Sequence, residues 1–175
     1  MEPTSISGDT LKTEEGQLNA VFACFGTAAQ HAQHFEAALG EFLLLFNKLS
    51  NRQLTTDAFD ALDQKLQKQT MGALLREFRK YVKVNNTDVE RCLESALESR
   101  NFLMHHYFRE RESNFGVERE RMAILAELVQ IGNSLEQATA LVGGMRIACS
   151  RAASNDQETA ATGGESLFSI EVTPR

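Results

Sequence analysis

The residues best suited to chemistry stand together in segment 97–109, LESRNFLMHHYFR. If this segment is helical, Arg100 lies on the expected core stripe, where a charge is not expected. The apolar residues of that stripe are Leu93, Leu97, Met104 and Phe108. A guanidinium in a helical core is costly unless a partner or a ligand compensates its charge. Glu36 occupies the equivalent place in the apolar stripe of an earlier segment. We therefore predict that Glu36 and Arg100 form an ion pair between two helices.

Two further polar residues lie at the edge of that stripe. Asn101 and His105 are one helical turn apart. An imidazole exchanges protons near neutral pH, and Arg100 would supply fixed positive charge for a phosphoryl oxygen. Asn101 would orient the imidazole or contact a substrate. His106 is the alternative base, and His105 is favoured because it shares an edge with Asn101. A second interpretation of the whole set is a structural ion pair whose polar neighbours complete a network in the core.

The string RNFLMH, from Arg100 to His105, resembles the R-x4-6-H signature of the HEPN superfamily, in which a polar residue, often Asn, follows the arginine. Extended to Tyr107, it becomes R-x4-H-x-Y, the form typical of HepT-like toxins. The resemblance implies a helical, metal-independent RNA endonuclease that acts as a toxin or defence component. It implies a homodimer whose interface cleft holds Arg100, Asn101 and His105. The alternative is a catalytically inactive HEPN-like interaction or regulatory protein.

The same resemblance implies further partners. RNA would be the substrate, and an antitoxin or a nucleotidyltransferase would be the regulator. Tyr107 matches the tyrosine that such a nucleotidyltransferase adenylylates in HepT-like proteins. Phe102 points away from the expected core stripe, where a monomer would expose it, which favours a dimer through this helix.

Composition limits the other possibilities. With 175 residues, of which 42% are hydrophobic and 24% charged, the chain predicts one globular domain, and it has no apolar run long enough for a membrane span. The formal net charge of −6 disfavours a general nucleic-acid coat protein. Segment 61–83 is locally basic, however, which indicates either a solvated helix face or a weak RNA track. Its basic residues are Lys65, Lys68, Arg76, Arg79, Lys80 and Lys83.

Neither a metal nor a cofactor is expected. Cys24, Cys92 and Cys149 are far apart and match no zinc or disulfide pattern, which favours a reducing, cytoplasmic location. The pair His31 and His34 lacks a third ligand nearby in the sequence.

The two prolines stand at positions 3 and 174, and the chain between them predicts an all-α fold. Threonines at 13, 55 and 70 are expected to cap helices, and Thr87 with Glu90 forms a capping box for a fourth helix. Apolar periodicity predicts helices over about 13–50, from 55 through Leu66, and over about 70–84, 87–113 and 117–150. The second and third of these are either separate or one continuous helix. The expected architecture is an antiparallel helical bundle of four to five helices with a long first helix and a flexible C-terminal tail.

The expected domain organisation follows from these helices. Residues 1–12 are predicted to be disordered, 13–150 to form the bundle, and 151–175 to form the tail. The terminal LFSIEV is compatible with a strand, with docking on the body or with a loose end. The tail composition predicts that its deletion barely changes the melting temperature.

Overall fold

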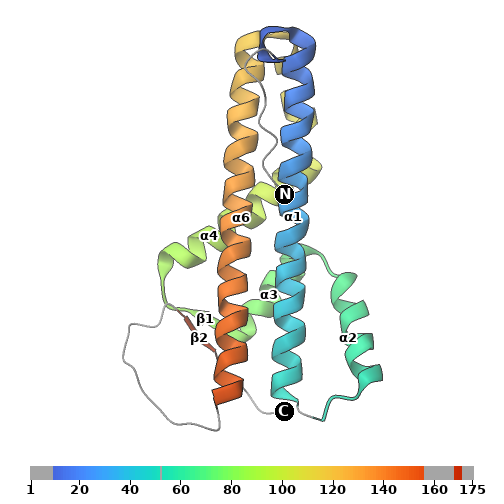
Figure 1. Ribbon diagram of the computed structural model, residues 1–175, viewed down its shortest axis with the longest axis vertical. Coiled ribbons are helices and arrows are strands. Elements are labelled where there is room, and N and C mark those ends of the chain that lie inside the picture. The colour runs from blue at the N-terminus through green and yellow to red at the C-terminus, as the bar shows by residue number, and fades with distance from the viewer. Residues whose placement is uncertain (1–9, 52, 156–167, 171–175) are drawn as a thin grey trace.

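The computed structural model describes residues 10–51, 53–155 and 168–170, and within them the predicted all-α helical bundle is confirmed. Figure 1 shows two long helices standing side by side, with the shorter helices against them. The described α-helices are α1 (Glu14–Ser50), α2 (Thr56–Gln67), α3 (Met71–Tyr81), α4 (Thr87–His105), α5 (Tyr107–Arg111) and α6 (Glu118–Asn155). None of them is long and apolar enough to cross a membrane.

The predicted helix starts follow from side-chain caps. The hydroxyls of Thr13, Thr55 and Thr70 each accept a hydrogen bond from the backbone N–H three residues on, at 3.1, 3.3 and 3.3 Å. The capping box at Thr87 is wrong by one residue. Asn86 is the cap of α4, and its side chain accepts from two backbone N–H groups, so Thr87 is the first helical residue.

The two long helices run parallel to each other. Three contacts between α1 and α6 advance in the same direction along both helices. They join Gln17 to Glu118, His31 to Gly132 and Glu41 to Arg146. The predicted antiparallel relation holds instead for α4 and α5 against α1, since Arg100 contacts Glu36 and Tyr107 contacts Phe25. The segment α4–α5 runs antiparallel to α1 and leads the chain back to the end of the molecule where α1 begins. Since α6 starts at that end, α6 points the same way as α1.

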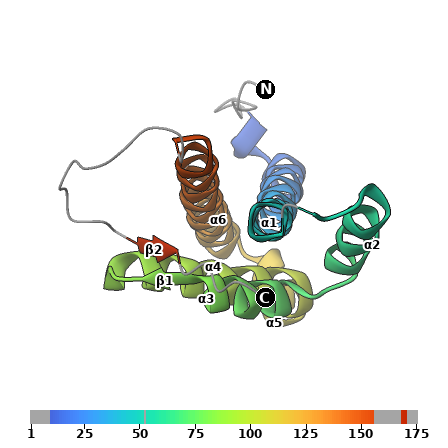
Figure 2. The same cartoon turned by 90° about the horizontal axis from the view of Figure 1, so that it is seen from below.

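The helices form two layers with the core between them (Figure 2). The α1–α6 pair is one layer, and α3, α4 and α5 lie across one face of it. Aromatic and aliphatic side chains fill the space, and the Phe42 and Phe78 rings meet edge to face at 4.8 Å. Burial of this apolar surface is the main force that holds the layers together. The fully buried large side chains include Phe35, Leu39, Phe42, Leu43, Leu75, Phe78, Leu93, Leu103 and Leu128.

The face that α4 buries differs from the prediction. Met104 and Phe108, expected in the core stripe, are 44% and 39% exposed. Ala96 and Leu103 are buried instead, because α4 packs against α6 as well as α1 and so turns its buried face toward α6. The predicted helix also does not run unbroken to residue 113. It ends at His105, and His106, with φ −128° and ψ −24°, separates α4 from α5.

Four further elements complete the described chain. The 3₁₀ helices η1 (Thr10–Lys12) and η2 (Glu112–Gly116) flank the start of α1 and of α6. The third helix stops at Tyr81, not at 84, because β1 (Val82–Val84) pairs antiparallel with β2 (Phe168–Ile170). The terminal LFSIEV thus supplies a strand. Disorder or a linker is expected over 1–12 and from 151 on, but residues 10–12 form η1 and α6 continues to Asn155. Residues 1–9, 156–167 and 171–175 lie outside the described residues.

Candidate functional site

The predicted ion pair between Arg100 and Glu36 is present. The Arg100 Nη2 donates to Glu36 Oε2 at 3.3 Å, joining α4 to α1. The two side chains are only 19% and 30% exposed, so water screens the pair less than it would at the surface. The glutamate therefore compensates the charge that the helical pattern identified as anomalous. This contact alone fits either a structural pair or a positioned functional arginine.

The second guanidinium nitrogen of Arg100 connects the remaining members of the motif. Its Nη1 donates to Asn101 Oδ1 and lies near His105 Nε2, both at 3.4 Å. If the guanidinium donates to Nε2, the neutral imidazole carries its proton on Nδ1. Asn101 and His105 are exposed, so a ligand can reach both. The structure thus brings Arg100, Asn101 and His105 together at the C-terminal end of α4.

His106 belongs to a separate contact. Its Nδ1 lies 2.8 Å from Nη2 of Arg109, and its ring centroid is 6.3 Å from that of His105. Since an arginine cannot accept a hydrogen bond, Nδ1 of His106 is the acceptor. Of the two adjacent histidines, the structure therefore places His105 against the motif arginine.

Tyr107 is buried, with 1% of its surface exposed. Its hydroxyl donates toward the backbone carbonyl of Ile124 and toward Glu127 Oε2, at 3.3 and 3.2 Å. Burial, reinforced by the Glu127 carboxylate, raises the pKa of the Tyr107 hydroxyl far above its usual value. A modifying enzyme cannot reach this oxygen in the folded conformation, so the expected adenylylation of Tyr107 does not fit the structure.

A bidentate ion pair holds the carboxylate beside Tyr107. Arg111 donates Nε to Glu127 Oε2 at 3.0 Å and Nη2 to Oε1 at 2.6 Å. These hydrogen bonds lower the pKa of Glu127. The same guanidinium lies 5.4 Å from the centre of the Phe102 ring. Phe102 is consequently half-buried under Arg111, which removes the exposed phenylalanine on which the predicted dimer depended.

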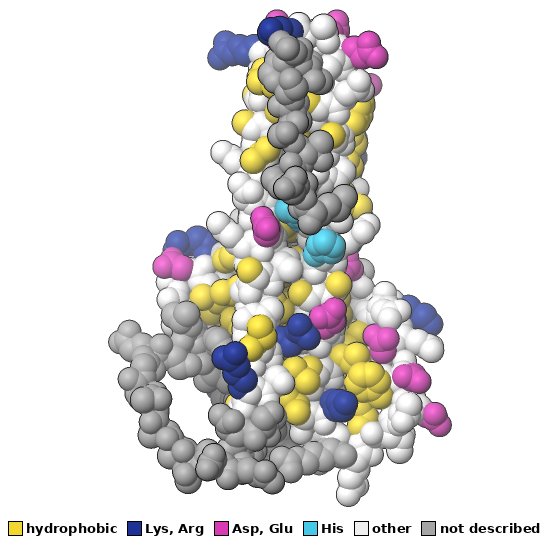
Figure 3. Space-filling view, viewed as in Figure 1, with side chains coloured by type: hydrophobic (Ala, Val, Ile, Leu, Met, Phe, Trp, Pro, Cys, Tyr) yellow, Lys and Arg dark blue, Asp and Glu magenta, His cyan; other side chains and the backbone are white. Residues whose placement is uncertain are grey.

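Carboxylates pair with Arg79 and Lys80, two of the six basic residues of segment 61–83. Arg79 pairs with Glu90 and with Glu94, the latter at 2.6 Å, and Lys80 pairs with Glu77 at 2.6 Å. Figure 3 shows basic and acidic side chains intermixed over one face of the molecule. The solvated-face interpretation therefore fits better than an RNA track. Lys65 and Arg76 lie on α2 and α3, Lys68 directly follows α2, and Lys83 lies in β1.

The His31–His34 pair lies on the open side of the α1–α6 layer. His31 Nδ1 lies 3.0 Å from the Gly132 carbonyl oxygen, to which it donates, and a pocket of about 240 Å³ adjoins both rings and Glu136. Among the described residues, no group of three or more His, Cys, Asp or Glu side chains is arranged to hold a metal ion.

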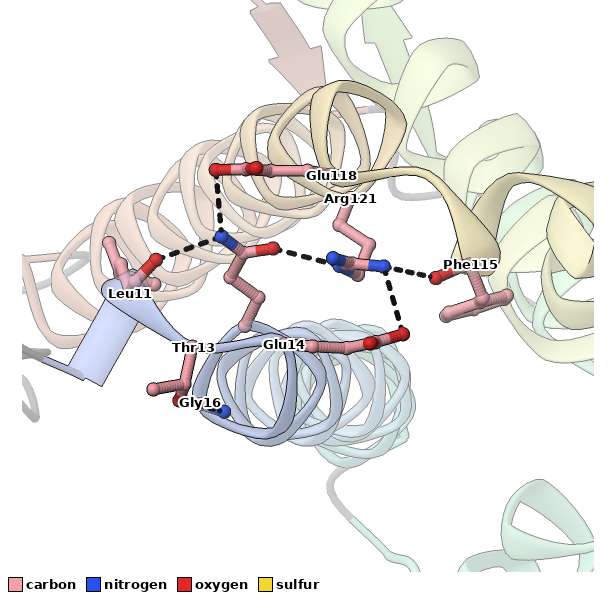
Figure 4. Close-up of polar contacts among 8 residues, drawn as sticks. Leu11, Thr13, Glu14, Gly16, Phe115, Glu118 and Arg121 are labelled. Atoms are coloured by element: carbon pink, nitrogen blue, oxygen red, sulfur yellow. Dashed lines mark hydrogen bonds and ion pairs between the residues drawn. The ribbon is translucent and has the colours of Figure 1, made fainter.

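A buried polar network escaped the sequence analysis. Arg121 is 5% exposed, and its Nε donates to Gln17 Oε1 at 2.8 Å, while its Nη1 donates to the Phe115 carbonyl at 2.8 Å. Figure 4 shows Arg121 between α1, η2 and its own helix, with Glu14 completing its contacts. Arg121 lies three and four residues before the buried Ile124 and Leu125. The helical spacing that placed Arg100 among apolar residues therefore also placed Arg121 among them.

No family model, curated protein or solved structure matches this chain. The resemblance to HEPN proteins therefore depends on the motif residues and on their arrangement alone.

Proposed function

We propose that this protein is a metal-independent RNA endonuclease of the HEPN type, acting as a toxin or defence component. The observation that carries the proposal is the 3.4 Å contact between the Arg100 guanidinium and Nε2 of His105. A base and a fixed cation this close can serve neighbouring oxygens of one phosphodiester. Asn101 in the same cluster supports the proposal, because it offers an amide to orient a substrate.

In the proposed mechanism, the Arg100 guanidinium turns from Nε2 of His105 to the substrate phosphate, which leaves Nε2 free to remove the proton from an RNA 2′-OH. That oxygen then attacks the adjacent phosphorus. Arg100 neutralises the charge that develops on the non-bridging oxygens. The 5′-oxygen leaves with a proton from an imidazolium or from water. The 5′ fragment then ends in a 2′,3′-cyclic phosphate, and DNA, which lacks the 2′-OH, is not cleaved. Glu36 keeps the guanidinium in place and is a positioning residue.

The proposed assembly is a homodimer regulated by an antitoxin or a nucleotidyltransferase. The exposed Met104 and Phe108 offer an apolar surface at the end of α4, in place of the half-buried Phe102. The buried hydroxyl of Tyr107 favours regulation by binding over modification of this tyrosine.

A second candidate is a non-catalytic helical interaction protein. The observation that favours it is the exposure of large apolar side chains, among them Phe22 at 55% and Val117 at 52%. Such surfaces commonly contact other proteins. In that case the Glu36–Arg100 pair serves only to join α1 to α4.

The test is cleavage of a labelled RNA by purified protein in EDTA, beside a DNA of the same sequence. We expect cleavage of the RNA alone, with loss of at least about a hundredfold in His105→Ala, as is typical for removal of a general base. His34→Ala is the matched control, because His34 is an exposed histidine on α1 outside the cluster. His106→Ala tests the alternative base.

Arg100→Lys keeps the charge and Arg100→Ala removes it, and melting curves of both separate lost catalysis from lost folding. The proposal fails if the wild type cleaves no RNA or requires Mg²⁺. It also fails if His105→Ala remains fully active, and the interaction protein then becomes the better interpretation.

A further inference from the structure

A second cavity lies beside the candidate site, between α4 and α6. Its volume is about 370 Å³, near the lower end of the range of about 300–1,000 Å³ that small-molecule pockets occupy. Arg100 faces α1, so this cavity is open on the other side of α4. It is lined by Ser95, Glu98, Ser99, Phe102, Glu127, Gln130, Ile131 and Ser134.

Most of the polar groups in this cavity have no protein partner. Within the part of the chain that the structure describes, the three serine hydroxyls, the Gln130 amide and the Glu98 carboxylate make no hydrogen bond or ion pair. A serine inside a helix commonly bonds a carbonyl of the preceding turn. These serines do not, so their hydroxyls are available to a ligand.

The rest of the lining is fixed and partly apolar. Phe102 and Ile131 supply the apolar surface, and Arg111 lies against the Phe102 ring. Arg111 also compensates the charge of Glu127 through two hydrogen bonds. Glu98, which is exposed to solvent, is therefore the one lining carboxylate without a cationic partner among the described residues.

We propose that this cavity, which we call the α4–α6 pocket, binds a guanine base of the RNA substrate. A flat base suits the apolar surface of Phe102 and Ile131, and the guanine N1–H and N2–H groups form adjacent donors that match the two oxygens of Glu98. Serine hydroxyls and the Gln130 amide suit the remaining acceptors. Adenine offers no such pair of adjacent donors. The inference rests on the proposed function, because it names the base next to the cleaved bond.

The position of the pocket relates it to the motif. Phe102 lies in the chain between Asn101 and His105, and three residues of helix span about 4.5 Å along the axis. Residues three apart on a helix are neighbours on its surface, so a base held against Phe102 lies on the side of α4 next to His105. The Arg100 guanidinium reaches this side through its contact with His105 Nε2. Cleavage next to guanosine is the expected consequence.

The test is calorimetric binding of GMP, IMP and AMP to the full chain. IMP lacks the N2 amine, so we expect GMP to bind at least about tenfold more tightly than IMP or AMP. Glu98→Gln should weaken GMP binding about tenfold and remove the difference from IMP. Glu136→Gln, the same change on α6 at the other pocket, is the control and should change nothing. Ser99→Val narrows the cavity and should weaken the binding of all three nucleotides.

Equal binding of the three nucleotides, no binding, or GMP affinity unchanged in Glu98→Gln would overturn the proposal. These readouts do not involve cleavage. GMP-selective binding without RNA cleavage would refute the nuclease and retain the pocket. RNA cleavage with no preference for guanosine, together with no GMP binding, would refute the pocket and retain the nuclease.

Discussion

Arg111 and Glu127 join α5 to α6 through two hydrogen bonds, with donor–acceptor distances of 3.0 and 2.6 Å. The buried Tyr107 hydroxyl donates to the same carboxylate at 3.2 Å. Because α5 follows directly after the break at His106, this contact fixes the chain immediately beyond His105. The candidate site is thus held from both sides, by Glu36 on α1 and by Glu127 on α6.

Arg111→Met should lower the free energy of unfolding by about 1–2 kcal/mol, because Glu127 then keeps a partly buried charge without its partner. Urea denaturation monitored by circular dichroism measures the change. The control is Arg91→Met, which breaks the exposed pair with Asp88 and should cost about 0.5 kcal/mol or less. Equal effects of the two variants would contradict a structural role for Arg111.

The stability of the protein should fall in acid through Glu127. Its hydrogen bonds with Arg111 lower the pKa of this carboxyl in the folded state. The contribution is therefore complete above the unfolded pKa of about 4.3 and is lost as pH falls through the lower folded pKa. Unfolding free energies from pH 6 down to pH 3 should show a shallower decline in Glu127→Gln than in wild type. Parallel curves would rule out the assigned linkage.

Arg121→Met should lower the free energy of unfolding by about 2–4 kcal/mol, which would place it among the most destabilising substitutions of a charged residue. The methionine fills similar space but leaves the Gln17 side-chain oxygen and the Phe115 carbonyl without their buried donor, at about 1–3 kcal/mol for each group. Arg119→Met, two residues earlier and exposed, serves as the control. Thermal melting compares the two variants, and a cost at Arg121 no larger than at Arg119 would show the network to be dispensable.

Truncation after residue 155 should lower the free energy of unfolding by about 1–2 kcal/mol, contrary to the expectation from the tail composition. It removes β2, whose Ile170 and Phe168 lie opposite Val82 and Val84 of β1, and each net hydrogen bond is worth about 0.5–1.5 kcal/mol. The melting temperature and the amide exchange of Lys83 and Val84 report the loss, because the Val82 N–H already bonds the Phe78 carbonyl of α3. An unchanged melting temperature together with unchanged exchange at Lys83 and Val84 would mean that the strand pairing contributes nothing.

Much of the fold could be predicted from local signals. Thr13, Thr55 and Thr70 cap helices because each hydroxyl meets an N–H only three residues away, a relation that the sequence contains in full. The pairing of Glu36 with Arg100 was also predictable, since each interrupts an apolar stripe. The relations between elements far apart in the sequence could not be predicted. The direction of α6 relative to α1 depends on how the intervening helices pack, and β1 forms because a segment 86 residues later pairs with it.

The candidate site was predictable to a similar degree. Spacing alone placed Arg100, Asn101 and His105 together, and the structure shows these contacts. The predicted stripe through Met104 and Phe108 was turned away from the face that is buried. Tyr107 lies four residues after the buried Leu103, on that buried face. Glu127 lies on another helix, and nothing near it in the sequence indicates that Arg111 is its partner.

The parallel direction of α1 and α6 has an electrostatic consequence. Each helix carries a partial positive charge at its N-terminus, and a parallel pair places two such ends side by side. The buried Arg121 adds a further positive charge at that end. The first turns of both helices are acidic, with Glu14 and Glu15 in α1 and Glu118 and Glu120 in α6. These four carboxylates offset the repulsion between the aligned helix dipoles.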